Sequence, residues 1–296
     1  MEFKGLHIPC VTPFDVGGGL SLPSLDRLLD YWLSHGVEGV VVNASTGEGP
    51  LMRGKEKSEV LRYVVERVGG RALVTAGTGS PSTEVAVGLT RTAEDLGADA
   101  ALVASPWFYK PSGEEVAQFF IDVASSTDLP IVLYNVPKFT GYSFTPNVVQ
   151  RVSEECSNIV ALKDSTGSPG YMAEVLSLCG SRVSCLSGSA DMVLPGLMLG
   201  GRGAVVAIGN VVPGVVSRLI AAFRDGSWTE AAEMQRVASR VNSVLVRGLP
   251  QVAAIKEALH QMGFDPGPPR RPLLPLGEEG REKVEALLQS LKPFLT

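Results

Sequence analysis

Lys163 is the residue whose type and position most clearly suggest chemistry. It ends the apolar run Asn158–Lys163 and is followed by Asp164-Ser165-Thr166-Gly167. A continuous apolar run of this length is typical of a strand buried in a parallel sheet. Burial disfavours the ammonium form of an amine, and a neutral lysine can attack a ketone to form a Schiff base. A lysine at a strand end can also extend its amine into water, so this segment alone leaves both interpretations open.

Polar residues that could assist such a lysine stand near the ends of two other apolar runs. Ser45 and Thr46 follow the run 39–44, and Tyr134 lies near the end of the run 131–135. Neighbouring hydroxyls and the N–H groups of a Gly-rich turn can hold a carboxylate, and a phenol can transfer protons. Each also has an ordinary interpretation, a capped turn for the hydroxyls and a core aromatic for the tyrosine.

Short apolar runs alternate with amphipathic helical segments along most of the chain. The predicted strands are Leu6–Thr12, Gly39–Ala44, Ala72–Gly77, Ala100–Ser105, Ile131–Asn135, Ile159–Lys163, Val183–Leu186 and Gly203–Ile208. The predicted helices, with Ser, Thr or Pro at several starts and Gly after several ends, are Ser24–His35, Ser58–Val68, Thr83–Leu96, Ser112–Ser126, Thr145–Glu155, Tyr171–Cys179, Asp191–Leu199 and Val212–Arg224.

Eight strands, each followed by a helix, predict an α/β protein with a (β/α)8 barrel. A doubly wound sheet is the alternative, but it would not need eight regular units. Barrel enzymes work at the C-terminal ends of their strands, so Ser45, Thr46, Tyr134 and Lys163 are expected to face one mouth. This convergence favours a chemical role for Lys163 over simple solvation.

The last part of the chain departs from the alternating pattern. The segments 227–247, 250–262 and 278–291 are helical with no strands between them. We therefore predict a barrel over residues 1–225 and a helical extension over residues 226–296 that packs on the barrel.

The composition argues against several other classes of protein. The net charge of −5 is modest and the basic residues are scattered, which does not favour a nucleic-acid partner. No stretch approaches the roughly 18 apolar residues of a membrane helix, and the start of the chain lacks the apolar core of a signal peptide. The four cysteines show no CxxC spacing and are interpreted as reduced thiols. We expect a cytoplasmic protein.

The sequence also disfavours metal and nucleotide chemistry. His7, His35 and His260 are far apart and show no ligand spacing, so we expect no metal. Gly77-Thr78-Gly79-Ser80 follows a strand but lacks the third glycine and the acidic residue of a dinucleotide site. We expect no cofactor.

One set of segments runs through nearly the whole chain: Pro9–Phe14, Ser45–Glu48, Tyr134–Pro137 with Thr140-Gly141, Leu162–Asp164, Ser187–Ser189, Gly203–Asn210 and Arg271–Leu273. Together they resemble the family of Schiff-base-forming class I aldolases and lyases that includes dihydrodipicolinate synthase and N-acetylneuraminate lyase. The resemblance implies pyruvate as a substrate. The implied roles are Schiff-base formation for Lys163, proton transfer for Tyr134, binding of the pyruvate carboxylate for Ser45 and Thr46, and lining of the pocket for Gly188 and the Val205 backbone.

Two departures from the synthase pattern bear on the second substrate. The synthase has an arginine that grips a carboxylate two residues after its Tyr-Asn-Val-Pro motif, and here that position is Phe139, preceded by Lys138. The synthase usually has alanine two residues after its lysine, and here Ser165 resembles the aldolases of hydroxylated 2-oxo acids. We therefore predict a metal-independent, pyruvate-dependent aldolase for a 2-keto-3-deoxy sugar acid or a 4-hydroxy-2-oxoglutarate.

Two alternatives remain open at this stage. One is dihydrodipicolinate (4-hydroxy-tetrahydrodipicolinate) synthase, which condenses pyruvate with aspartate semialdehyde. The other is a non-catalytic barrel that binds 2-oxo acids, because a third departure affects the proton relay. The family typically supplies a tyrosine from a neighbouring subunit, and here the aligned residue is Phe108, followed by Tyr109. Water or a substrate hydroxyl would then substitute.

The same aromatic stretch, Trp107-Phe108-Tyr109, bears on association. The family is mostly tetrameric and its dimers meet near this stretch, so the resemblance implies a homo-oligomer, a dimer or a tetramer. A lid over the chain's own site is the alternative interpretation of these aromatics.

Overall fold

Eight parallel strands close into a barrel in the computed structural model, which describes residues 2–294. Each strand pairs with its sequence neighbours, and β8 pairs with β1. The predicted (β/α)8 fold is thereby confirmed. The strands are β1 (Gly5–Pro9), β2 (Gly39–Val42), β3 (Leu73–Gly77), β4 (Ala100–Ala104), β5 (Ile131–Asn135), β6 (Ile159–Asp164), β7 (Ser184–Ser187) and β8 (Gly203–Val205).

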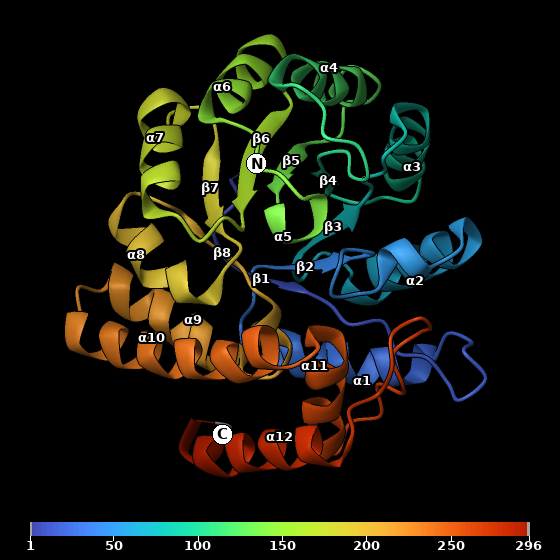
Figure 1. Ribbon diagram of the computed structural model, residues 1–296, viewed down its shortest axis with the longest axis vertical. Coiled ribbons are helices and arrows are strands. Elements are labelled where there is room, and N and C mark those ends of the chain that lie inside the picture. Colours follow the sequence, from blue (N-terminus) through green and yellow to red (C-terminus); the bar gives the residue numbers. More distant parts are fainter. Residues whose placement is uncertain (1, 295–296) are drawn as a thin grey trace.

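Helices surround the barrel, and Figure 1 shows α2, α3, α4, α6 and α7 following one another around it. Their apolar stripes pack against the outer faces of the strands, as the amphipathic patterns predict. The barrel helices are α1 (Leu22–Ser34), α2 (Gly54–Val68), α3 (Thr83–Asp95), α4 (Gly113–Ala124), α5 (Pro137–Thr140), α6 (Pro146–Glu155), α7 (Pro169–Cys179), α8 (Val193–Met198) and α9 (Pro213–Arg224), with the short 3-10 helices η1 (Gly49–Leu51), η2 (Ala190–Met192) and η3 (Ala207–Asn210).

Several local predictions were wrong. The strand predicted over Leu6–Thr12 ends at Pro9, and the helix predicted over Ser58–Val68 begins at Gly54. The strand predicted over Gly203–Ile208 ends at Val205, and η3 (Ala207–Asn210) follows it. The side-chain amide of Asn210 explains the early end, because it donates to Pro9 O and accepts from Val11 N–H, which ties this segment to the end of β1. The short helix α5 was not predicted at all. It begins at Pro137, a residue that is well suited to a first helical turn.

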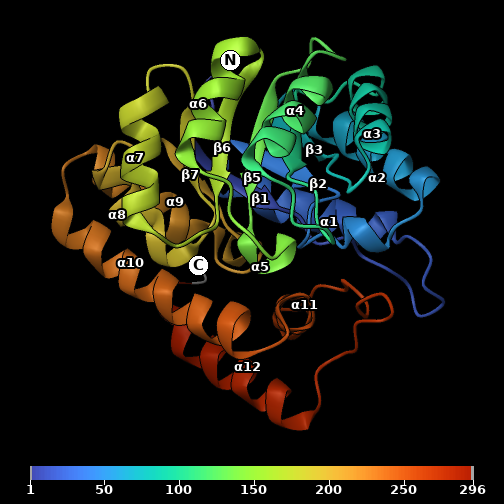
Figure 2. The same ribbon diagram turned by 45° about the horizontal axis from the view of Figure 1, so that its top comes forward.

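The C-terminal helices lie together on one side of the barrel, and α12 is outermost (Figure 1). They comprise α10 (Trp228–Asn242), the π-helical stretch η4 (Ser243–Gly248), α11 (Gln251–Gln261), α12 (Glu278–Leu291) and η5 (Lys292–Phe294). Helix α10 packs along α9, and α11 packs against α12 and η3. Figure 2 shows α11 below the end of the barrel where α5 lies, so the extension reaches the mouth.

No helix among residues 2–294 is long and apolar enough to cross a membrane. All four cysteines are buried and free.

At the opposite end of the barrel, the rings of Phe3 and His7 are buried and stacked. His7 is buried, its ring stacks on Phe3 with centroids 5.4 Å apart, and a side chain at Gly39 would collide with the imidazole. The His7 Nε2 atom lies 3.1 Å from Lys4 O, which suits a neutral ring that donates from this nitrogen. Burial lowers the pKa of His7 from its ordinary value of 6.5 to about 4.

This depressed pKa predicts a pH-dependent stability. Between pH 6.5 and 4 the unfolded chain binds a proton at His7 that the folded chain does not, so stability falls as the pH falls. We expect protonation of His7 in the unfolded chain to lower the free energy of unfolding by about 2 kcal/mol between pH 7 and pH 5. Urea denaturation of wild type and His7→Gln at the two pH values measures it. The exposed His260→Gln variant should behave as wild type, and equal pH slopes for wild type and His7→Gln would contradict the prediction.

Candidate active site

Lys163 and Tyr134 face each other inside the mouth of the barrel. They are direct partners in the register of β5 and β6, and both are buried. The Lys163 Nζ atom lies 4.0 Å from the centroid of the Tyr134 ring. Register and alternation direct both side chains inward at the same level, which places a nucleophilic amine beside a phenol.

The carboxylate that follows Lys163 in sequence does not pair with it. Asp164 is buried and accepts from the N–H and the hydroxyl of Thr166. Burial raises the pKa of Asp164, and the hydrogen bonds from Thr166 act in the opposite direction. Within residues 2–294 no acidic side chain forms an ion pair with Lys163, whereas the other buried lysine, Lys256, pairs with Glu48. The Lys163 amine is therefore open to a carbonyl carbon.

The hydroxyls predicted to hold a carboxylate stand next to this pair. Ser45 Oγ lies 3.5 Å from the Tyr134 hydroxyl, so the turn after β2 reaches the Lys163–Tyr134 pair. Thr46 is buried, and its Oγ1 accepts from the side-chain amide of Gln251 at 3.3 Å. Because Gln251 supplies the donor, the Thr46 hydroxyl proton remains available to a bound anion.

The turns after β6 and β7 approach each other closely at Gly188. The Gly188 N–H donates to Asp164 O at 2.6 Å, and a side chain at this position would collide with Ser165 Oγ. Within the described part of the chain, the Ser165 hydroxyl forms no hydrogen bond. It lies beside Gly188, in the space that a side chain there would occupy. Val205 ends β8 and belongs to the buried cluster that fills the inside of the barrel. These positions suit the pocket-lining roles predicted for them.

Helix α5 carries the residues that replace the expected arginine. Phe139 is half exposed, and the Lys138 Nζ atom lies 5.5 Å from the centroid of its ring. Lys138 reaches Val246 O and the Gln251 side-chain oxygen, each at 3.4 Å. The lysine therefore points toward the C-terminal extension. Phe139 contributes a half-exposed apolar ring to α5, the short helix that follows β5.

The aromatic residues of the loop after β4 are largely exposed. Phe108 and Tyr109 are 87% and 77% exposed, and they pack edge-to-face with centroids 5.2 Å apart. Phe108 has a φ of 80°, a left-handed conformation that a bulky side chain rarely adopts. This exposure does not fit a closed lid.

Sequence reasoning missed Gln251, which contacts both Thr46 and Lys138. No spacing or motif signals it, because its partners are distant in the chain and its own segment reads as an ordinary amphipathic helix. Among residues 2–294, no three His, Cys, Asp or Glu side chains gather in a group that could hold a metal ion.

Comparisons with known proteins identify the family of the chain. The model of the dihydrodipicolinate synthetase family matches residues 2–291. The chain belongs to this family. It is 38% identical to a 4-hydroxy-tetrahydrodipicolinate synthase of Desulforudis audaxviator, with 98% of each chain covered. A dihydrodipicolinate synthase structure from Bacillus anthracis has a TM-score of 0.95 at 35% identity, covering 98% of this chain and 99% of that one.

A further structural neighbour is YagE, a prophage protein of the same family from E. coli K12 solved in complex with pyruvate. It has a TM-score of 0.93 at 31% identity, with 99% of both chains covered. Family membership makes the chain a class I, Schiff-base carbon–carbon lyase. This sets aside the non-catalytic alternative.

The geometry predicts a large loss of proton transfer in Tyr134→Phe. Removing the phenol should slow the exchange of pyruvate methyl protons with deuterated water by about a hundredfold, the usual scale for a general acid–base group. Proton NMR of pyruvate with the enzyme measures this exchange without a second substrate. Tyr63→Phe on α2 is the matched control and should exchange at the wild-type rate. Exchange by Tyr134→Phe at that rate would exclude the role.

Proposed function

We propose that the chain forms a Schiff base between Lys163 and the keto carbon of pyruvate. The Lys163 amine adds to the carbonyl, and loss of water leaves an iminium. Removal of a methyl proton then gives an enamine, whose carbon attacks an aldehyde to form the new carbon–carbon bond. Hydrolysis releases the product and regenerates the amine; the reverse sequence is an aldol cleavage. The observation that carries the proposal is the buried Lys163 amine facing Tyr134 with no acidic partner in the described residues.

The neighbouring groups suit the remaining steps. Tyr134 would give and take the protons of the dehydration, of the pyruvate methyl group and of the aldehyde oxygen. The hydroxyls of Ser45 and Thr46 would hold the pyruvate carboxylate, and Gly188 would line the pocket beside Ser165. The iminium itself acts as the electron sink, so this sequence of steps uses no metal and no cofactor.

For the second substrate, the relatives favour aspartate semialdehyde. Relatives from several organisms, 31–38% identical over almost the whole chain, carry the name 4-hydroxy-tetrahydrodipicolinate synthase. We therefore propose condensation of pyruvate with this semialdehyde as the first candidate activity. This reverses the preference that we drew from the sequence alone.

Aldol cleavage of a hydroxylated 2-oxo acid is the second candidate. Two residues favour it: the unengaged Ser165 hydroxyl beside Gly188, which could meet a substrate hydroxyl, and the half-exposed Phe139, which cannot pair with a carboxylate. Sugar acids of the 2-keto-3-deoxy type and 4-hydroxy-2-oxoglutarate are the corresponding substrates.

Trapping with borohydride tests the shared first half of the reaction. Treatment of the enzyme with pyruvate and sodium borohydride should reduce the iminium and attach one pyruvate to Lys163, located by peptide mass spectrometry. Lys163→Met should give no adduct, and Lys256→Met, which alters the other buried lysine, should still give it at saturating pyruvate. An adduct on a lysine other than Lys163 would overturn the assignment.

A panel of second substrates separates the two candidates. Turnover is measured with pyruvate plus aspartate semialdehyde and, in the cleavage direction, with 2-keto-3-deoxy sugar acids and 4-hydroxy-2-oxoglutarate. We expect the highest kcat/KM with aspartate semialdehyde. Faster cleavage of a hydroxylated acid would favour the second candidate, and Ser165→Ala should then lower kcat/KM for that acid by about tenfold, the usual value of a lost substrate hydrogen bond.

We further propose that the chain forms a homo-oligomer through the exposed pair Phe108 and Tyr109, and that it works in the cytoplasm. Two exposed aromatics that pack edge-to-face on each other suit a buried interface anchor. Light scattering of wild type and of a Phe108→Ser/Tyr109→Ser variant tests this. Equal masses would contradict the interface.

A further inference from the structure

The turn that carries Ser45 and Thr46 contains a residue in an unfavourable backbone conformation. Glu48 ends the turn with a φ of 59° and a ψ of 24°, the left-handed region that an L residue with a side chain rarely adopts. Such a conformation persists when surrounding contacts determine it. Here those contacts come from two sources, the start of the chain and the C-terminal extension.

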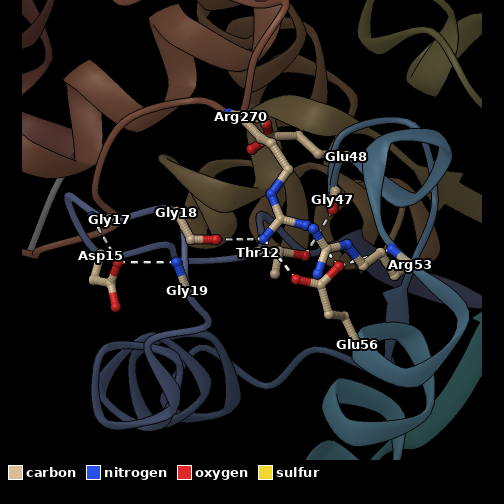
Figure 3. Close-up of polar contacts among 10 residues, drawn as sticks. All are labelled: Thr12, Asp15, Gly17, Gly18, Gly19, Gly47, Glu48, Arg53, Glu56 and Arg270. Atoms are coloured by element: carbon tan, nitrogen blue, oxygen red, sulfur yellow. Dashed lines mark hydrogen bonds and ion pairs between the residues drawn. The ribbon is translucent and has the colours of Figure 1, made fainter.

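Three successive residues of the turn are each fixed by a distant partner. The Thr46 hydroxyl oxygen accepts from Gln251 on α11, and the Gly47 carbonyl accepts from the Thr12 hydroxyl at 2.7 Å. The carboxylate of Glu48 forms an ion pair with Lys256 of α11, with Nζ and Oε1 2.7 Å apart. Figure 3 shows Glu48, Gly47 and Thr12 clustered where the C-terminal segment meets the turn.

The ion pair between Glu48 and Lys256 is buried. Both side chains are almost fully buried, at 0% and 2% exposed for Glu48 and Lys256. The second Glu48 oxygen accepts from the backbone N–H of Arg270 at 2.6 Å. Lys256 also donates to Pro268 O at 3.0 Å. The Lys256 amine lies 4.5 Å from the ring centroid of Phe14. Burial lowers the pKa of Lys256, and the charge of Glu48 opposes that change.

Arg270 anchors the outer side of the same cluster. Its guanidinium donates to both oxygens of Glu56 at 2.8 Å and to Gly18 O (Figure 3). The guanidinium carbon lies 4.0 Å from the ring centroid of Phe14. The cluster thus joins the C-terminal segment to α2 and to the loop after β1. Because the Glu48 carboxylate is buried and contacts both the Lys256 amine and the Arg270 backbone N–H, a shift of the turn would have to break these contacts.

We propose that Glu48, Lys256 and Gln251 are positioning residues of the pyruvate site, and that α11 of the C-terminal extension sets where the Ser45 and Thr46 hydroxyls stand. The inference rests on the proposed function. Ser45 lies three residues before Glu48 and its oxygen is 3.5 Å from the Tyr134 hydroxyl. A shift of the turn would therefore move the anion-binding hydroxyls away from Lys163 without changing Lys163 or Tyr134.

The test separates pyruvate binding from chemistry. The variants are Glu48→Gln, Lys256→Met and Gln251→Ala, and the readout is the pyruvate concentration that half-saturates borohydride trapping on Lys163. We expect an increase of about tenfold or more for the two ion-pair variants, since charge-assisted contacts are the strong ones. Methyl-proton exchange at saturating pyruvate should stay within about threefold of wild type, the pattern of a loss confined to binding. Lys256→Arg, which keeps the charge, should restore part of the affinity.

Glu257→Gln is the matched control, because Glu257 lies beside Lys256 on α11 but pairs with Arg281, at 3.7 Å. It should trap pyruvate as wild type does. Circular dichroism checks that the variants fold. If the ion-pair variants do not fold, Gln251→Ala tests the proposal instead, since Gln251 is partly exposed and lies at the start of its helix. Folded variants with wild-type half-saturation would overturn the inference, whereas a wild-type enzyme that forms no adduct would overturn the proposed function itself.

Discussion

Tyr134 and Lys163 occupy the same level of β5 and β6, and this register holds the amine over the phenol ring. The closed parallel barrel leaves neither strand free to slide, because a change of one residue would turn each inward side chain outward. Every other element of the site is placed relative to this pair. The turn after β2 brings hydroxyls to it, and the turns after β6 and β7 narrow the pocket beside it.

Residues with local or periodic signals could be predicted from the sequence, and residues with distant partners could not. The continuous apolar runs revealed the strands, and their ends revealed Lys163, Tyr134 and Ser45. Gln251 and Lys256 lie in a helix of ordinary pattern, and Gln251 is 205 residues from the Thr46 hydroxyl that it contacts. Likewise, β8 ends early because Asn210 binds backbone at the end of β1, a contact that no local pattern of apolar residues encodes.

The two halves of the substrate question rest on different parts of the molecule. In the proposed reaction, the pyruvate half would involve buried groups on strands and one tightly fixed turn. The aldehyde half would face α5 and the turn after β6, where Phe139 and Ser165 lie partly exposed. Side chains at such a rim can change without disturbing the core. Family membership therefore defines the nucleophilic chemistry more firmly than it defines the electrophile.

The contacts between α11 and the turn after β2 also have a consequence for biosynthesis. A ribosome that has already synthesised all eight strands has not yet added Gln251, Lys256 or Arg270. The nascent barrel therefore lacks the partners that hold Glu48 in its left-handed conformation. If α11 positions the Ser45 and Thr46 hydroxyls as proposed, the chain gains the ability to bind a 2-oxo acid only after α11 and the segment that carries Arg270 have been synthesised and have packed on the barrel. A nascent chain that lacks these segments would then not compete with the folded enzyme for pyruvate.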